Sequence, residues 1–181
     1  VYNKGDHIRF GFIGNLSRHK GVHVLVNAFV GLNSRNASLS IFGSGDTAYR
    51  EKLVEMSGDA NVKFTGTFQA AELGEVFEQI DVLIAPSIWY ENYPFVISEA
   101  FASIVPVIAS NLGGMAERIQ AGNNGYLFTA GDTSELEIIL RNIITDPTII
   151  NQMKEFIRIK ELVPNIEQEA YVEDRLYKTI A

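Results

Sequence analysis

Short apolar segments alternate with longer amphipathic segments over the first 130 residues, and this alternation limits the possible folds more than any other feature. The expected strands are the short segments at 8–14, 38–42, 62–65, 82–85, 106–109 and 125–128. Between them, apolar side chains recur at helical spacing, for example at Val22, Leu25, Val26 and Phe29. Buried strands that alternate with helices are typical of a parallel sheet covered on both faces. We therefore expect an α/β fold with a doubly wound, Rossmann-like sheet.

The strand pattern ends near residue 132, and the rest of the chain is expected to be helical. Apolar periodicity predicts helices over 136–144, 149–159 and 166–180, which would form a helical C-terminal tail. A length of 181 residues suits one domain, and no linker or internal repeat divides the chain. Residues 1–181 are therefore expected to form a single domain.

Composition excludes several classes of function. The net charge of −7 disfavours a nucleic-acid-binding surface, because phosphate backbones need a basic face. The absence of cysteine excludes disulfides and thiolate metal sites, and it agrees with a reducing, cytoplasmic location. No apolar run reaches the roughly 18 residues that a membrane span needs. The polar start without methionine leads us to expect an excised fragment or a processed chain.

The loops that follow the strands are where a ligand is expected, because open parallel sheets bind ligands at the carboxyl ends of their strands. The sequence lacks the Gly-x-Gly-x-x-Gly and phosphate-loop patterns at these positions. Lys20 precedes the first helix, where a cation and free amide groups suit a phosphate, although a solvated lysine is the alternative. Arg18 and His19 could act in its place. Gly43 and Gly45 predict either a tight turn or a ligand loop.

The segment WYENYPFVISEA, residues 89–100, carries two glutamates eight positions apart. Pro94 fits the first turn of a helix, so the amide groups around Phe95 and Val96 form an expected site for an anion or a hydroxyl. Glu99 lies within an otherwise apolar helix, where a carboxylate needs hydrogen-bond partners. A pair of sugar hydroxyls would supply them; a surface-facing Glu99 is the alternative. Glu91 precedes the helix.

The loop after the fifth expected strand contains Gly113 and Gly114, which allow the backbone to approach a ligand closely. The chain has no Asp-x-Asp pair, and its three histidines all lie within the first 23 residues. A catalytic metal ion is therefore not expected.

These motifs, in this order, resemble the C-terminal, nucleotide-sugar-binding half of GT-B glycosyltransferases, close to glycosyltransferase family 4. The resemblance covers residues 8–144 and rests on FIGNLSRHKGV, SIFGSGD, VKFTGTF, DVLIAPSIWYENYPFVISEAFASIVPVIASNLGGMAE and NGYLF. The most specific part is the pair of glutamates followed by EAFASIVPVIAS and the Gly-Gly loop.

The resemblance implies a role for each motif residue. Glu91 would face the transferred sugar, Lys20 would neutralise the leaving diphosphate, and both are expected to be catalytic. Glu99 would hold the ribose hydroxyls, and the loop at 66–68 would lie near the base. The expected donor-binding residues are Gly14, Asn15, Arg18, Phe68, Asn92, Tyr93, Phe95, Val96, Glu99, Gly113 and Gly114. The implied reaction is transfer of a hexosyl group from a UDP or GDP sugar to an acceptor hydroxyl, with retained configuration and without a metal ion or other cofactor.

The chain departs from the family pattern at three points. Asn15 stands where arginine is common. One of the two cations expected to hold the diphosphate is therefore missing or is supplied by Arg18. Asn92 and Tyr93 replace a common Gly-Phe pair. GT-B enzymes have two domains, and only the donor domain is recognised here. The expected partners are the nucleotide-sugar donor and an N-terminal acceptor domain of the same enzyme. A membrane would be contacted only through that acceptor domain, and the chain itself could associate with a second copy. A non-catalytic nucleotide-binding or interaction module and half of a nucleotide-sugar epimerase remain alternatives.

Overall fold

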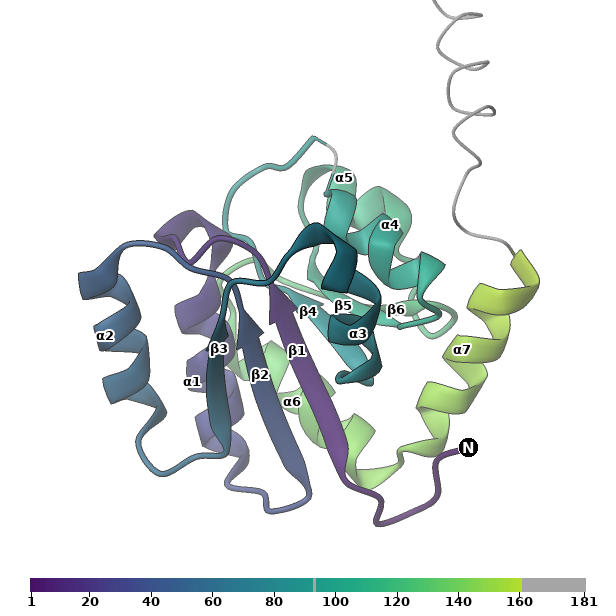
Figure 1. The fold of residues 1–181 in the computed structure, drawn as a ribbon. Coiled ribbons are helices and arrows are strands. Elements are labelled where there is room, and N and C mark those ends of the chain that lie inside the picture. Colours follow the sequence, from purple (N-terminus) through teal and green to yellow (C-terminus); the bar gives the residue numbers. More distant parts are fainter. Residues whose placement is uncertain (93, 161–181) are drawn as a thin grey trace, which may run out of the picture.

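The computed structural model describes residues 1–92 and 94–160. In this part of the chain, parallel strands form one six-stranded sheet with the order β3-β2-β1-β4-β5-β6 (Figure 1). The strands are β1 (Ile8–Ile13), β2 (Ala37–Phe42), β3 (Val62–Gly66), β4 (Val82–Ala85), β5 (Val107–Ser110) and β6 (Gly125–Phe128). Each lies within one residue of its expected position. The prediction of a doubly wound, Rossmann-like fold is confirmed, because this strand order is that of the dinucleotide-binding fold.

Helices connect the strands and form the C-terminal part of the described chain. They are α1 (Val22–Leu32), α2 (Thr47–Ser57), α3 (Leu73–Glu78), α4 (Phe95–Ala102), α5 (Gly113–Arg118), α6 (Thr133–Thr145) and α7 (Thr148–Lys160), with short 3-10 helices η1 (Arg18–Lys20) and η2 (Ala70–Glu72). Lys20 precedes the first helix, as the sequence predicts, and ends the short 3-10 helix η1. Helix α1 starts after Gly21, whose left-handed φ of 69° ends η1 and redirects the chain into α1. The helix expected at 166–180 lies outside the described residues.

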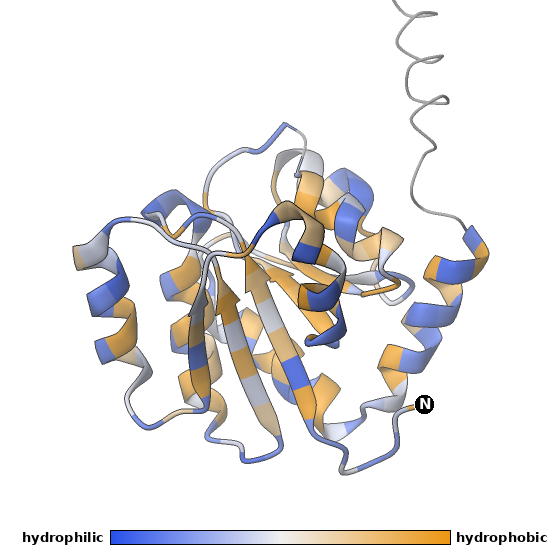
Figure 2. Ribbon diagram, in the orientation of Figure 1, coloured by the Kyte–Doolittle hydropathy of each residue, from blue (hydrophilic) through white to orange (hydrophobic). Residues whose placement is uncertain are grey.

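The two faces of the sheet are covered by separate apolar layers (Figure 1). Phe10 and Phe12 of β1 belong to the layer that includes α1, α2 and α6. Leu83 of β4 belongs to the opposite layer, with α3, α4 and α5. Figure 2 shows apolar colours concentrated on the sheet and on the inward sides of the helices. No helix in the described residues is long and apolar enough to cross a membrane.

The chain changes direction across the sheet between β1 and β4. β1 pairs with β2 on one side and with β4 on the other, and β4 then pairs with β5. The loops that leave the carboxyl ends of β1 and β4 therefore lead to opposite sides of a switch point. In open α/β sheets such a point forms a ligand-binding crevice.

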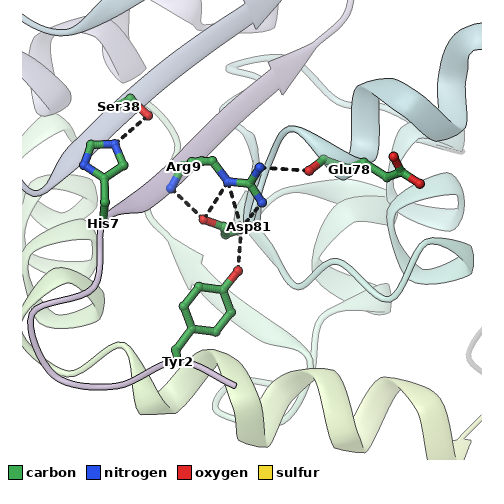
Figure 3. A network of polar contacts seen from close by, with 6 residues as sticks. All are labelled: Tyr2, His7, Arg9, Ser38, Glu78 and Asp81. Carbon is green, nitrogen blue, oxygen red and sulfur yellow. Dashed lines mark hydrogen bonds and ion pairs between the residues drawn. The ribbon is translucent and has the colours of Figure 1, made fainter.

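At the opposite end of β1, a polar network ties the N-terminal segment to the start of β4 (Figure 3). Asp81 is 1% exposed and accepts hydrogen bonds from the Arg9 backbone amide at 2.8 Å, from the Arg9 guanidinium and from the Tyr2 hydroxyl. The Arg9 guanidinium also donates to the carbonyl oxygen of Glu78 at 2.9 Å. This network fixes the amino ends of the two strands whose carboxyl ends form the switch point.

Candidate functional site

Lys20 and Glu91 form an ion pair at the switch point. The Lys20 Nζ lies 2.8 Å from Glu91 Oε2, and the side chains are 31% and 20% exposed. Lys20 comes from the loop after β1 and Glu91 from the loop after β4. The pair lines a cavity of about 30 Å³ together with apolar side chains that include Phe12 and Met115. The structure thus brings together the two residues that the sequence nominated as catalytic.

Backbone contacts hold the loops after β1 and β4 against each other. The carbonyl oxygen of His19 accepts hydrogen bonds from the Ile88 amide at 2.8 Å and from the Ser87 hydroxyl at 3.0 Å. A Cβ atom added to Gly21 would lie 1.8 Å from the carbonyl oxygen of Pro86, so this position admits only glycine without movement of the backbone. Sequence reasoning missed Ser87, because a serine in a loop carries no signal of its tertiary partner.

The Gly-Gly loop also packs against the Glu91 segment. The Gly114 amide donates to the Glu91 carbonyl oxygen at 3.0 Å, and a Cβ on Gly114 would lie 2.4 Å from the Asn92 carbonyl oxygen. Gly113 has a φ of +53°. The close backbone approach expected here is confirmed, but its observed partner is the backbone of Glu91 and Asn92. Approach to a ligand at Gly113 and Gly114 stays a prediction.

The loops after β1 and β2 also make close contact. The Gly14 amide donates to the Phe42 carbonyl oxygen at 3.0 Å, and a Cβ on Gly43 would lie 1.9 Å from the Gly14 carbonyl oxygen. Asp46 caps α2 by accepting a hydrogen bond from the Tyr49 amide at 2.8 Å, as the sequence predicts. Gly43 therefore acts at least as a packing residue for this turn.

Glu99 lies in the second turn of α4 and is partly buried. Burial raises the pKa of its carboxyl group above the ordinary value. No other residue in the described part of the chain forms a hydrogen bond or ion pair with this side chain. Phe95, one turn earlier on the same side of the helix, is 69% exposed. A partly desolvated carboxylate without a protein partner is suited to accept hydrogen bonds from a ligand.

The other expected donor-binding residues differ in where they lie relative to the cavity of the Lys20–Glu91 pair. Arg18 and Asn15 are exposed, and Arg18 supplies no second cation to the cavity. Phe68 packs edge-on against Phe42, with ring centres 6.3 Å apart. Val96 does line the cavity, whereas Tyr93 lies outside the described residues.

No cluster of three or more histidine, aspartate or glutamate side chains that could hold a metal ion occurs in residues 1–92 and 94–160. The pair at the switch point offers a different chemistry. The ammonium group of Lys20 can bind a phosphate, and the carboxylate of Glu91 can accept a hydrogen bond from a hydroxyl. Both groups lie in a cleft that is partly shielded from water, where such contacts are stronger than in bulk solvent.

Comparisons with known proteins agree with the fold. An uncharacterized glycosyltransferase, MJ1607, of Methanocaldococcus jannaschii is 31% identical over 165 residues, which cover 87% of this chain and 42% of that protein. Among solved structures, Anabaena HepE (Alr3699) in complex with UDP-glucose superposes with a TM-score of 0.83 at 23% identity, covering 95% of this chain and 49% of that chain. The chain thus spans less than half the length of both proteins.

A shorter solved structure matches over nearly its whole length. It is the C-terminal domain of LpcC, a glycosyl transferase group 1 family protein from Francisella tularensis, with a TM-score of 0.75 and 19% identity. The match covers 89% of this chain and 86% of that domain. The sequence model of the family "Glycosyl transferases group 1" matches residues 7–146, which include both loops of the Lys20–Glu91 pair. On this match, the chain belongs to the group 1 family of glycosyl transferases.

Proposed function

We propose that this chain is the donor-binding half of a glycosyltransferase that takes a nucleoside diphosphate sugar as its donor. The observation that carries the proposal is the Lys20–Glu91 pair at the switch point, 2.8 Å apart. In the proposed complex the cation binds the diphosphate and the carboxylate beside it binds the sugar, in the crevice where this fold binds nucleotides. The UDP-glucose in the Anabaena HepE structure supports a donor of this class.

The proposed reaction transfers a hexosyl group from a UDP or GDP sugar to an acceptor hydroxyl, with retention of anomeric configuration. Lys20 stabilises the charge that develops on the diphosphate as its bond to the sugar breaks. Glu91 faces the sugar, and Glu99 accepts hydrogen bonds from the ribose hydroxyls. We propose that transfer needs no metal ion, since the sequence contains no Asp-x-Asp pair and offers Lys20 as the counter-charge.

The proposed partner within the enzyme is an N-terminal acceptor domain. The chain matches less than half of MJ1607 and of HepE but nearly all of the C-terminal domain of LpcC. The acceptor would bind between the two domains, and any contact with a membrane would be made by the other one. The cytoplasmic location expected from the cysteine-free composition belongs to this proposal.

Asn15 favours a second candidate function, a nucleotide-binding module without transferase activity. This exposed residue stands where the family resemblance leads us to expect arginine, and Arg18 does not reach the cavity to replace it. Asn15→Arg discriminates the two functions. If the enzyme is active and already holds the diphosphate without an arginine at position 15, this substitution leaves turnover of the full-length protein within a few-fold of wild type. A chain that lost activity with its arginine gains turnover.

The proposal is tested by calorimetric titration of this chain with UDP, GDP, UDP-glucose and uridine in the presence of EDTA. We expect at least one nucleoside diphosphate to bind, and to bind more tightly than its nucleoside. A folded chain that binds none of the diphosphates contradicts the proposal. The anomeric configuration of the product of the full-length enzyme, determined by NMR, tests retention.

A further inference from the structure

We propose that Glu91 pairs with Lys20 whenever no donor is bound and thereby limits affinity for the diphosphate. On binding, the donor pairs with the lysine instead and frees the carboxylate to face the sugar. This inference rests on the proposed function and extends it from the identity of the ligand to the regulation of its binding. It assigns to Glu91 a role before the chemical step, as a counter-ion that competes with the substrate.

The geometry of the pair supports competition. The Lys20 Nζ already has a carboxylate partner at 2.8 Å, and Lys20 is the only cation among the residues that line this cavity in the described part of the chain. The cavity measures about 30 Å³, which is too small for a diphosphate beside an intact pair. A diphosphate that binds Lys20 within this cavity must therefore move the ammonium group, the carboxylate or both.

The backbones on both sides of the pair are fixed, so exchange of partners falls to the side chains. Glu91 is held through its carbonyl oxygen by the Gly114 amide at 3.0 Å, and the Lys20 amide donates to the Ser17 carbonyl oxygen at 3.1 Å. The exposed fractions of 31% for Lys20 and 20% for Glu91 leave both side chains access to solvent. The pair can thus open by rotation of two flexible side chains without movement of the loops.

Opening of the pair has a consequence for the order of events. A free Glu91 carboxylate next to the diphosphate would be repelled by it, so this carboxylate is most stable when it accepts hydrogen bonds from sugar hydroxyls. A complete nucleotide sugar supplies these hydroxyls, whereas a nucleoside diphosphate alone does not. The pair therefore favours the intact donor over the product diphosphate, and it re-forms when the diphosphate leaves.

The first test compares the affinity of wild type and Glu91→Gln for UDP and for uridine, or for GDP and guanosine if the guanine nucleotide is the one bound. Loss of the competing carboxylate should tighten diphosphate binding by about two- to fivefold, the range expected for a partly exposed ion pair. Nucleoside binding should stay unchanged. The matched control is Glu137→Gln, because Glu137 also pairs with a cation, Arg141 at 2.6 Å, on α6 away from the site. That variant alters net charge equally and should not change the affinity.

A double-mutant cycle with Lys20→Met separates competition from direct repulsion between Glu91 and the diphosphate. If Glu91 acts through Lys20, Glu91→Gln gives a smaller gain in the Lys20→Met background than in wild type, because only the direct repulsion remains there to be relieved. A gain of the same size in that background overturns the inference, as does unchanged diphosphate affinity in Glu91→Gln alone. Absence of diphosphate binding by every variant instead overturns the proposed function, and the inference falls with it.

A structure of the wild-type chain with bound diphosphate tests the inference without any substitution. We expect Lys20 Nζ to contact a phosphate oxygen and to lie more than about 4 Å from Glu91 Oε2, beyond the limit of an ion pair. A complex in which the pair keeps its present distance while the diphosphate binds overturns the inference.

Discussion

At the scale of single residues, the site combines groups whose environments differ. Lys20 and Glu91 neutralise each other across two loops, although they lie 71 positions apart in the sequence. Glu99 has no such partner, and burial raises the pKa of its carboxyl group. The structure thus contains one charge pair and one carboxyl group whose partial burial no protein partner offsets. This difference leads to distinct predictions for Lys20 and Glu99.

Lys20→Ala should weaken binding of UDP or GDP far more than binding of the corresponding nucleoside. The lysine contacts only the diphosphate in the proposed complex, and a charge-assisted hydrogen bond contributes about 1.5–3 kcal/mol. Calorimetry with the diphosphate and the nucleoside measures the difference. Arg141→Ala removes a remote cation and is the matched control. An equal loss for both ligands would show that Lys20 acts elsewhere or only through folding.

Glu99→Gln should weaken binding of the nucleotide sugar by about 1–2 kcal/mol, because one charged acceptor is lost without a change in volume. The free energy of unfolding should not fall. Burial raises the pKa of the Glu99 carboxyl group in the folded state, so this state binds the carboxyl proton more tightly than the unfolded state does. The free energy of unfolding therefore falls as the pH rises through the folded pKa and the group becomes charged. Calorimetry and urea unfolding at pH 7 measure the two effects. Unchanged affinity would exclude the ribose role.

At the scale of elements, the sheet is constrained at both ends of β1 and β4. The carboxyl ends lead into loops that touch at Gly21 and Pro86, and the amino ends are joined by Arg9 and Asp81. The position of Lys20 relative to Glu91 depends on both constraints, because each residue leaves one of these two strands.

Gly21→Ala should destabilise the chain and weaken diphosphate binding together. A left-handed φ of 69° costs an alanine about 1–2 kcal/mol, and the added Cβ would meet the Pro86 carbonyl oxygen at 1.8 Å. The backbone must shift, and Lys20 shifts with it. Gly122→Ala is the control, since Gly122 has a φ of +80° but no atom within 4 Å of the added Cβ. Urea unfolding and calorimetry should show a larger loss for Gly21→Ala; equal losses would refute the contact.

Asp81→Asn should lower the free energy of unfolding at pH 7 by about 1–3 kcal/mol, because Arg9 and Tyr2 lose a charged acceptor. The Arg9 side chain is 45% exposed, so water can hydrate its guanidinium group once the charged acceptor is lost. The loss in free energy of unfolding therefore stays below that of a fully buried ion pair. Burial alone would raise the pKa of Asp81, but hydrogen bonds from Arg9 and Tyr2 outweigh burial and lower it.

The lowered pKa of Asp81 fixes the sign of its pH dependence. Its contribution to stability is present above the unfolded value, near 3.8, and is lost as the pH falls through the folded value. Urea unfolding from pH 7 down to pH 2 should therefore show a smaller acid-dependent loss in Asp81→Asn than in wild type. Parallel curves would show that another carboxyl group carries this dependence.

At the scale of the whole molecule, the described chain has its own core on both faces of the sheet, whereas Lys20 and Glu91 at the switch point remain partly exposed. Ile88, Trp89, Tyr90 and Phe95, beside Glu91, are large apolar side chains at least 39% exposed. We predict that the purified 181-residue chain folds alone and binds a nucleoside diphosphate but transfers no sugar. Circular dichroism, calorimetry and a transfer assay with a radiolabelled donor measure these properties. Donor-dependent glycosylation of an acceptor by this chain alone would contradict the prediction.

Self-association of the isolated chain remains part of the same prediction. It rests on the apolar periodicity of residues 166–180, which lie outside the described residues, and on a cleft face that would lack its partner domain. Analytical ultracentrifugation over a range of concentrations checks it. Addition of a separately produced acceptor domain should suppress any dimer, because both would compete for the same apolar surface.

The sequence by itself determined the order and type of the described elements and the location of the loops that follow the strands. Apolar periodicity is a local property, so it predicted each strand to within one residue, and the cap at Asp46 was equally readable. The turn at Gly21 carried no such local signal, because its place in the fold is set by the contact with Pro86. Motif order also pointed to Lys20, Glu91 and Glu99 as site residues.

Only the tertiary structure decided which of these groups meet. The strand order places β1 beside β4, so Lys20 faces Glu91 across the switch point, while Arg18 stays outside the cavity. The same order pairs Arg9 with Asp81 and sets the Gly-Gly loop against the Glu91 backbone. These contacts join residues far apart in the chain, and their strength depends on distance and burial. Neither quantity is written in a local pattern of residues, because both arise when the sheet brings its strands together.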